Sequence, residues 1–393
     1  MKKSRLLIYF LSVGIPGLVL LKLVFDFAHQ RSQDQGIPGG ASVSSSDLNP
    51  AMPGFSQSTA TAAEPKNAKG YNDRGLARRA RGDLDGAIGD YTRALALDPR
   101  YAQAYSNRGI AKQMKGDISG AIADYTQAIT LDPKYAHAYN NRGIAKANLG
   151  DLNGAMADFN QAVAIDPKNP QAYHNRGMAR TITGDWDGAI ADYSQAIAIN
   201  PKDVMACNNR GIAKANKGDL DDAIADYTMA IMIDPGDAQA FSNRGLARMA
   251  KHDLNGAIGD FQQAITLHPQ NSDYAHFYLW LAQTGQNRKT DADSELTAYM
   301  TSRPDVYAGD WPSKVGGFLL GQINEADFLS AASSGDPQKN PRLHCEAWYY
   351  AGMKHLLVGE KTAAANDFQK CLATNQKDSP EYFCAVTGLK MLK

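Results

Sequence analysis

Six prolines recur along this chain at a strict interval of 34 residues. They stand at the ends of apolar, helix-patterned segments, at Pro99, Pro133, Pro167, Pro201, Pro235 and Pro269. A fixed period of this length is typical of solenoids, in which each repeat is one small unit that cannot bury its apolar face alone. The period therefore predicts a stack of similar units.

One unit, residues 102–133, shows what each repeat contains. Its first half is apolar at Tyr105 and Ile110, and Gly116 followed by an aspartate is a turn signal. The second half carries apolar side chains at helical spacing until Pro133, which cannot continue a helix. We therefore expect a helix, a turn and a second helix in every unit.

Small residues recur where the two helices of a unit are expected to face each other. In this unit they are Gly109, Ala121 and Ala128, and the aromatic residues Tyr105 and Tyr125 lie beside them. Helices approach closely only where the side chains at the contact are small. Six consecutive units with this pattern, residues 66–269, resemble the tetratricopeptide repeat family. The resemblance implies an all-α fold, a right-handed superhelical solenoid with a C-terminal capping helical module.

After Pro269 the period weakens and then returns. We predict a degenerate repeat over 270–304, a helical connector over 305–344, a further repeat over 345–378 and a capping helix over 379–393. The further repeat has its diagnostic residues at Trp348, Gly352, Gly359, Ala364, Phe368 and Cys371. The segment "WPSKVGGFLLGQINEADFLSAA" and the repeat after it resemble the C-terminal part of NlpI-like envelope proteins of bacteria. That resemblance implies a non-enzymatic adaptor that docks proteases and cell-wall hydrolases, although this chain lacks their lipidated cysteine.

The N-terminus predicts a membrane attachment. Residues 1–5 are basic and residues 6–25 are apolar except for Lys22. Twenty residues of helix span about 30 Å, the thickness of a bilayer's hydrocarbon core. We interpret 1–5 as a cytoplasmic stub, 6–25 as a single-pass signal anchor in the inner membrane and 26–65 as a flexible linker to a body in the periplasm or exterior. The alternative is a cleaved signal peptide and a secreted or periplasmic protein.

Helix geometry separates packing residues from candidate binding residues. Asn107 lies two residues before Gly109, about 200° around the helix, and so points away from the partner helix. In tetratricopeptide arrays the first helices line the concave groove, so the resemblance places an asparagine ladder there, with aliphatic residues between its members. The candidate peptide-binding residues are Asn107, Asn141, Asn175, Asn209 and Asn243, with Ile110, Ile144, Met178, Ile212 and Leu246. The alternative is that these asparagines hydrogen-bond neighbouring helices.

Charged residues repeat with the same period. Arg108 and Lys112 lie four residues apart, and Asp124 recurs in the facing helix. We interpret these sets as structural ion pairs within or between units. The alternative is a basic stripe for acidic ligands.

No motif for catalysis, metal binding or a cofactor stands out. Lys plus Arg and Asp plus Glu both number 41, and this neutral balance argues against nucleic-acid binding. Cys371 could form a disulfide with Cys345 or Cys384, or all could stay free. We therefore predict a membrane-tethered adaptor for proteins or extended peptides, without a cofactor. The alternatives are a self-associating structural protein that uses the apolar segment 315–320, and a small enzymatic module in 305–393.

Overall fold

The computed structural model describes residues 64–304, 309–333, 341–376 and 379–392. The predicted stub, the signal anchor and all of the linker except its last two residues lie outside these ranges. Every regular element in the described ranges is a helix, and none of these helices is long and apolar enough to cross a membrane. The predicted all-α solenoid of helix–turn–helix repeats is confirmed.

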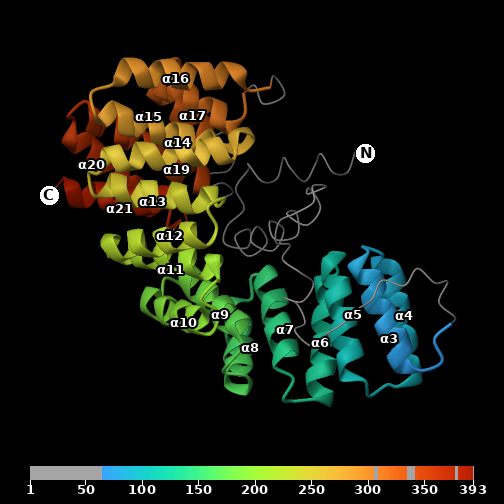
Figure 1. Ribbon diagram of the computed structural model, residues 1–393. Coiled ribbons are helices and arrows are strands. Elements are labelled where there is room, and N and C mark those ends of the chain that lie inside the picture. The colour runs from blue at the N-terminus through green and yellow to red at the C-terminus, as the bar shows by residue number, and fades with distance from the viewer. Residues whose placement is uncertain (1–63, 305–308, 334–340, 377–378, 393) are drawn as a thin grey trace. The chain divides into compact units, whose positions relative to one another are not determined.

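The described residues form two compact units, 64–179 and 180–392, with the boundary inside α9 (Pro170–Thr183). Before α9, the N-terminal unit holds three helix pairs in sequence order (Figure 1). They are α3 (Ala68–Ala80) with α4 (Leu84–Leu97), α5 (Ala102–Met114) with α6 (Ile118–Leu131), and α7 (Ala136–Asn148) with α8 (Leu152–Ile165). The first helices of successive pairs also contact one another. In these pairs the first helix therefore packs on the second helix of its own pair and on the first helix of the next pair.

The C-terminal unit continues the repeats and then adds a different kind of module. The repeats comprise α10 (Trp186–Ile199), α11 (Val204–Lys217), α12 (Leu220–Ile233), α13 (Ala238–Ala250) and α14 (Leu254–Leu267), followed by the short η1 (Pro269–Asn271). The remaining helices are α15 (Asp273–Gly285), α16 (Lys289–Ser302), α17 (Trp311–Leu319), α18 (Glu325–Ser333), α19 (Pro341–Leu357), α20 (Lys361–Ala373) and α21 (Pro380–Met391). We call residues 68–267 the regular repeats and residues 273–392 the aromatic module.

Local chemistry explains the repeated helix–turn–helix shape. Gly116 ends the first helix of its repeat with a φ of 89°, a conformation that glycine adopts without strain. Asp117 then caps α6 by accepting a hydrogen bond from the Gly120 N–H at 2.9 Å. Between the helices, a Cβ on Gly109 would lie 2.7 Å from the ring of Tyr125, so no larger residue fits there without a shift. Glycine at position 109 is therefore required by this contact.

The aromatic module is held together by large rings. Phe277, Tyr349 and Tyr350 are fully buried, and the ring of Phe318 stacks on that of Phe328 with centroids 4.2 Å apart. Helix α21 packs on α13, α19 and α20, so the C-terminal helix contacts the last regular repeat.

The segment proposed for self-association belongs to this core. Val315 is fully buried, Phe318 is 2% exposed and Leu319 is 1% exposed. The hypothesis that 315–320 is an exposed apolar patch is therefore wrong, because α17 turns that face inward onto the aromatic module.

Candidate functional site

The charged residues of each repeat form a buried ion-pair network. Arg108 donates two hydrogen bonds to the carboxylate of Asp124, from Nε at 2.9 Å and from Nη2 at 2.7 Å, and Lys112 Nζ lies 2.8 Å from the same carboxylate. The Asp124 side chain is only 5% exposed. Matching sets centre on Asp90, Asp158, Asp226 and Asp260. The predicted structural ion pairs are confirmed.

The arginine of each set also reaches the preceding repeat. Arg108 Nη1 lies 3.3 Å from Thr92 Oγ1, and Arg142 Nη1 lies 3.2 Å from Thr126 Oγ1. Arg210 makes the same contact with Ser194. One guanidinium thus joins two helices of its own repeat to the second helix of the repeat before it.

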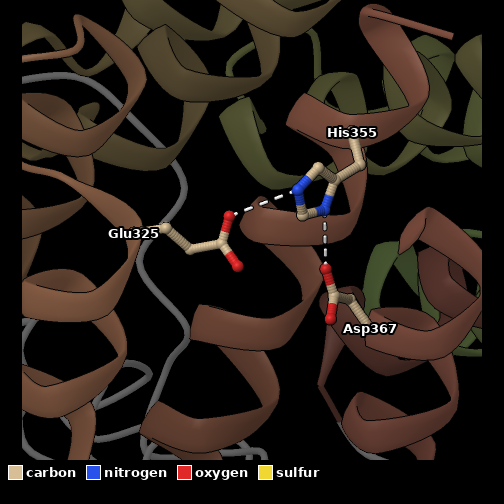
Figure 2. A group of neighbouring side chains, drawn as sticks. All are labelled: Glu325, His355 and Asp367. Carbon is tan, nitrogen blue, oxygen red and sulfur yellow. Dashed lines mark hydrogen bonds and ion pairs between the residues drawn. The ribbon is translucent and has the colours of Figure 1, made fainter. Parts of the chain in front are cut away.

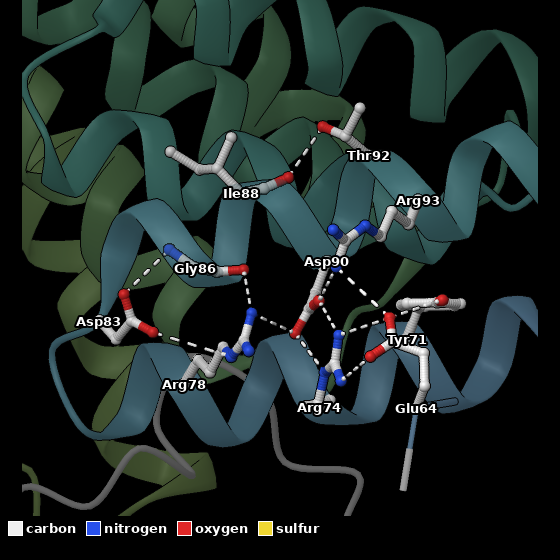
Figure 3. A network of polar contacts seen from close by, with 10 residues as sticks. All are labelled: Glu64, Tyr71, Arg74, Arg78, Asp83, Gly86, Ile88, Asp90, Thr92 and Arg93. Carbon is white, nitrogen blue, oxygen red and sulfur yellow. Dashed lines mark hydrogen bonds and ion pairs between the residues drawn. The ribbon is translucent and has the colours of Figure 1, made fainter. Parts of the chain in front are cut away.

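At the first repeat of the described residues, an acidic side chain occupies the place that a hydroxyl of the preceding repeat takes in later repeats. Arg74 binds Asp90 through Nε and Nη2 at 2.9 and 2.7 Å, and its Nη1 lies 3.2 Å from Glu64 Oε2 (Figure 3). Tyr71 also donates a hydrogen bond to Glu64 at 2.9 Å (Figure 3). Arg74 lowers the pKa of this exposed carboxyl. Glu64 therefore accepts the hydrogen bond that, in later repeats, the arginine donates to a hydroxyl of the preceding repeat.

The asparagine ladder connects neighbouring repeats. Asn107 Nδ2 donates to Asn72 Oδ1 at 2.9 Å, and both side chains are almost fully buried. The same 35-residue step joins Asn175 to Asn140 and Asn243 to Asn208. Each acceptor is the residue just before a ladder position. The sequence analysis did not single out these acceptors, although the recurring asparagine at 72, 140 and 208 was a signal for them. This geometry favours the alternative in which the ladder binds helices together.

The aliphatic members of the predicted groove lie mostly in the core. Ile110, Ile144, Met178 and Leu246 are between 3% and 7% exposed. Ile110, for example, packs with Ala121, Tyr125 and Ala145 of the next repeat. The next repeat covers Ile110, and all four side chains are buried, so they are not presented to a ligand in this structure.

Two repeats keep the candidate surface accessible. Asn209, Ile212 and Asn243 are partly exposed, whereas the earlier ladder members Asn107, Asn141 and Asn175 are between 2% and 8% exposed. Helices α11 and α13, which carry the partly exposed ones, contact each other. Asn216 on α11 is partly exposed, and Met205 on α11 and Gln239 on α13 are exposed. We call the set the α11–α13 face: Met205, Asn209, Ile212, Asn216, Gln239 and Asn243.

The predicted cysteine pair is brought together by the aromatic module. Cys345 Sγ lies 2.7 Å from Cys371 Sγ, and both thiols are fully buried and free. The neighbouring Cys345 and burial raise the pKa of Cys371. Cys384 is also buried and free, and no contact places it within bonding reach of Cys371 in the described residues. The geometry therefore favours Cys345 of the two alternatives, and disulfide formation stays a prediction.

Two buried carboxylates were missed by the sequence analysis. Glu346 Oε2 accepts hydrogen bonds from Trp311 Nε1 at 2.6 Å and from the Tyr274 hydroxyl at 2.9 Å. Glu381 accepts one from the Tyr278 hydroxyl at 2.6 Å. Burial, with the nearby Glu381, raises the pKa of Glu346 to about 7. These glutamates come from α19 and α21, and only the tertiary fold places them together.

A histidine-centred group was missed too. His355 Nδ1 lies 2.8 Å from Asp367 Oδ2, and its Nε2 lies 3.3 Å from Glu325 Oε2 (Figure 2). The Nε2 atom is also 3.6 Å from Glu360 Oε2. His355 and Asp367 are 12 residues apart, the spacing of Lys112 and Asp124, so aligning the last repeat on the others would have revealed the substitution.

Comparisons with known proteins support the repeat assignment. Residues 75–116, 114–150, 147–181 and 178–218 match a model described as TPR repeat, and residues 206–237 match a model described as Tetratricopeptide repeat. This part of the chain consists of tetratricopeptide repeats. The comparison with curated proteins gives no match.

Several solved structures are similar over part of the chain. YrrB, described as "a TPR protein with an unusual peptide-binding site", is 25% identical, with 46% of this chain and 93% of that chain covered and a TM-score of 0.41. MamA is 28% identical, with 44% and 94% covered and a TM-score of 0.39. PilF of Pseudomonas aeruginosa is 18% identical, with 51% and 92% covered and a TM-score of 0.47.

Proposed function

We propose that this tetratricopeptide repeat protein is an adaptor that binds an extended segment of a partner protein, and that the α11–α13 face is the principal contact surface. Proteins built from such repeats mediate protein–protein interactions. The proposal goes further in naming the surface and the form of the ligand, and it assigns no chemical reaction to the chain.

The observation that carries the proposal is the change in exposure along the ladder. Asn209 and Asn243 are partly exposed, whereas Asn107 is 2% exposed. An asparagine side chain offers two donors and an acceptor, so an amide that binds a neighbouring helix keeps capacity for a further hydrogen bond. The backbone of an extended peptide presents donors and acceptors at regular steps whatever its sequence.

The same surface can also take apolar side chains. Met205 is 41% exposed and lies on the same helix as the partly exposed Ile212. Methionine adapts its shape to different partners, which suits a surface that accepts more than one side chain. A peptide on this face would thus find polar groups for its backbone and flexible apolar groups between them.

Site-specific photo-crosslinking tests the surface. A benzophenone amino acid placed at Met205 or Gln239 should capture a partner segment, because both residues belong to the α11–α13 face. The matched control positions are Gln195 and Gln263, exposed residues on the second helices α10 and α14. Equal capture from both pairs of positions would contradict the proposal.

A binding measurement then tests the amides. A synthetic peptide of the captured segment should bind the Asn209→Ala/Asn243→Ala protein at least 10-fold more weakly than the wild type. The control is Asn107→Ala/Asn141→Ala, which alters buried ladder members and should leave this affinity unchanged. If the two double variants bind equally well, the ladder at 209 and 243 does not contact the peptide.

We further propose that residues 6–25 anchor the protein in a bacterial inner membrane, with the repeats on the outer side, as in an NlpI-like adaptor attached by a helix instead of a lipid. The apolar run behind Lys2, Lys3 and Arg5 supports this. The full chain should stay in the membrane after alkaline extraction, and its repeats should be digested by protease added from the periplasmic side. Recovery of a mature chain that starts after residue 25 would instead indicate a cleaved signal peptide.

A further inference from the structure

An arginine recurs in the regular repeats, and its surroundings recur with it. In the second repeat, Arg108 Nη2 donates to Asp124 Oδ1 at 2.7 Å, and Nη1 donates to Thr92 of the preceding repeat at 3.3 Å. The guanidinium carbon lies 5.5 Å from the centre of the Tyr105 ring. Arg142 has the same surroundings one repeat later. A carboxylate, a polar group of the preceding repeat and an aromatic ring thus surround the cation, which suits the flat fork of a guanidinium.

The degenerate repeat, α15 with α16, has a leucine instead of this arginine. Counted from the first residues of α5 and α15, Leu279 takes the place of Arg108. Glu295 takes the place of Asp124, at the same distance along the chain. Asp124 is only 4% exposed, whereas Glu295 is an exposed residue. The degenerate repeat therefore keeps the carboxylate and presents it to solvent, without the cation.

The other two parts of these surroundings are also kept. His276 takes the place of the aromatic ring, and it stacks on Tyr299 with ring centroids 3.6 Å apart. Gln262 of α14 takes the place of the polar group of the preceding repeat. An amide can fill this role, because Arg176 Nη1 donates to Asn160 Oδ1 at 3.0 Å at the matching place. The degenerate repeat thus retains every partner of a guanidinium.

These partners line one groove of about 540 Å³ between α14, α15 and α16. The three helices follow one another in the C-terminal unit, and α15 contacts both of the others (Figure 1). The lining includes Gln262, His276, Leu279, Glu295 and Tyr299, and among the lining residues there is no lysine or arginine. The groove thus lies where the regular repeats hold an arginine, and Glu295 gives its lining a negative charge.

The ionisable groups of this groove offer acceptors. Glu295 Oε2 accepts a hydrogen bond from Gln283 at 2.9 Å, which leaves Oε1 for a further donor. His276 Nδ1 lies 3.0 Å from the carbonyl oxygen of Ser272, so Nδ1 carries the hydrogen and Nε2 is an acceptor. Burial lowers the pKa of His276, which keeps the ring neutral, and the Glu295 carboxylate acts on this ring electrostatically. A ligand that matches these groups brings hydrogen-bond donors and a positive charge.

The arginine next to the groove in the sequence is already bound elsewhere. Arg303 follows the lining residue Ser302, but its side chain is only 8% exposed. It pairs with Asp273 and Asp310, each at 2.8 Å. The Glu295 carboxylate therefore stays accessible to a cation from another molecule.

We propose that this groove is a docking site for an arginine side chain of a partner protein. The guanidinium would donate to Glu295 and to Gln262 and lie against the ring of His276, as Arg108 does with its own partners in the second repeat. Arginine suits the groove better than lysine, because its planar fork serves two acceptors at once and stacks on rings. The partner is a protein because proteins built from such repeats mediate protein–protein interactions. The site is separate from the α11–α13 face and does not depend on it.

Ligand-observed NMR with the full-length chain tests the charge. Nα-acetyl-arginine amide should bind about 10-fold more tightly than Nα-acetyl-citrulline amide, which has the same shape but no positive charge. Glu295→Gln should weaken binding of the arginine probe about 10-fold. The matched control is Asp291→Asn, which removes an exposed carboxylate of the same helix outside the groove and should leave the affinity unchanged. No binding of the arginine probe, equal binding of the two probes, or no effect of Glu295→Gln would overturn the proposal.

A second variant fills the groove from within the chain. Leu279→Arg restores the arginine of the regular repeats, so its side chain should pair with Glu295, raise the melting temperature and weaken probe binding about 10-fold. Unchanged probe binding by the folded variant would place the probe elsewhere and contradict the proposal. Leu279 is 5% exposed, so if this variant does not fold, the result for Glu295→Gln at an exposed position decides the question.

Photo-crosslinking tests whether the arginine belongs to a protein. A benzophenone amino acid at Ala298, an exposed residue of the groove, should capture a partner segment that contains an arginine. A synthetic peptide of that segment should bind about 10-fold more weakly when citrulline replaces the arginine. An unchanged affinity would contradict the docking role. Tighter binding of free arginine than of its acetylated amide would also contradict it, because the groove would then be a site for a small molecule.

Discussion

The regular repeats and the aromatic module share a helix–turn–helix frame but neutralise their buried carboxylates differently. In the regular repeats each buried aspartate faces two permanent cations, as Asp158 does with Arg142 and Lys146. In the aromatic module Asp367 faces a histidine, and Glu346 faces hydroxyl and indole donors and one arginine. The first arrangement is built from arginine and lysine partners, whereas the second uses a histidine and mostly neutral hydrogen-bond donors. The regular repeats thus use one set of charged partners throughout, whereas the aromatic module surrounds each buried carboxylate with different partners.

The largest expected effect breaks the regular ion-pair network. Asp158→Ala leaves Arg142 and Lys146 without their carboxylate in a largely buried site, which should cost on the order of 3–5 kcal/mol of unfolding free energy. Asp367→Ala should cost less, because His355 still faces Glu325 and Glu360. Urea denaturation of the two variants measures the difference.

The control for this pair is Asp85→Ala. Asp85 pairs with Lys115 on the surface, where its side chain is 82% exposed, so its loss should change stability little. If Asp158→Ala were as mild as Asp85→Ala, the repeats would not depend on their buried charges.

The second effect concerns pH and belongs to the aromatic module. Burial raises the pKa of Glu346 from its usual 4.5 to about 7, so between these pH values the folded chain holds a proton that the unfolded chain releases. The unfolding free energy should therefore fall as the pH rises from about 4.5 to about 7. At about 1.4 kcal/mol per pKa unit, the loss is on the order of 3 kcal/mol.

Glu346→Gln isolates this contribution, since it keeps an acceptor for Trp311 and Tyr274. Urea midpoints at pH 5 and pH 8 should differ less in the variant than in the wild type. An unchanged difference would assign the pH dependence to other groups.

The third effect is shared by both regions. A Cβ on Gly143 would lie 2.7 Å from the Phe159 ring, and one on Gly352 would lie 2.7 Å from the Phe368 ring. Gly143→Ala and Gly352→Ala should each cost about 1–3 kcal/mol, because the ring must move in a packed core. Thermal denaturation of both variants tests whether the helix contact is equally strict in the two regions.

A glycine at an exposed helix position provides the opposite control. A Cβ on Gly259 meets nothing within 4 Å, and other repeats carry Ala123 or Ala157 there. Gly259→Ala should stabilise its helix by about 0.5–1 kcal/mol. If Gly259→Ala instead lowered the stability, contact with a neighbouring ring would not be the only reason why glycine occurs in these helices.

The smallest expected effect tests the asparagine ladder as a structural element. Asn107→Ala removes the donor to the buried Asn72 and should cost about 1 kcal/mol, whereas Asn243→Ala, at a partly exposed site, should cost less. The double variant Asn72→Ala/Asn107→Ala should cost less than the sum of its single variants, as a double-mutant cycle measures. Additive losses would argue that the two amides do not interact.

The period and the residue types predicted the helix pairs, their turns and the ion pairs, since all of these depend on contacts inside one repeat. Arg108 and Asp124 are 16 residues apart, close enough for the helix–turn–helix pattern alone to bring them together. The exposure of Asn107 and Ile110 was not predictable in this way. Rotation around a helix shows that Asn107 points away from its partner helix, but it does not show that the neighbouring repeat covers that side.

The aromatic module was the least predictable region. Its apolar segment at 315–320 has the same composition whether it faces solvent or the core, and only the fold shows that it lies inside. The His355 group unites α18, α19 and α20, and Glu346 and Glu381 meet their donors across helices far apart in the chain.

By itself, the sequence determined the repeated helix pair, because a glycine facing an aromatic ring and an arginine facing an aspartate are requirements of one local contact. The tertiary structure alone decided which members of the ladder stay accessible, which cysteines are neighbours and which carboxylates surround His355. Those outcomes depend on how one helix pair is covered by the next, and burial by a neighbouring element is not encoded in the spacing of residues along a single helix.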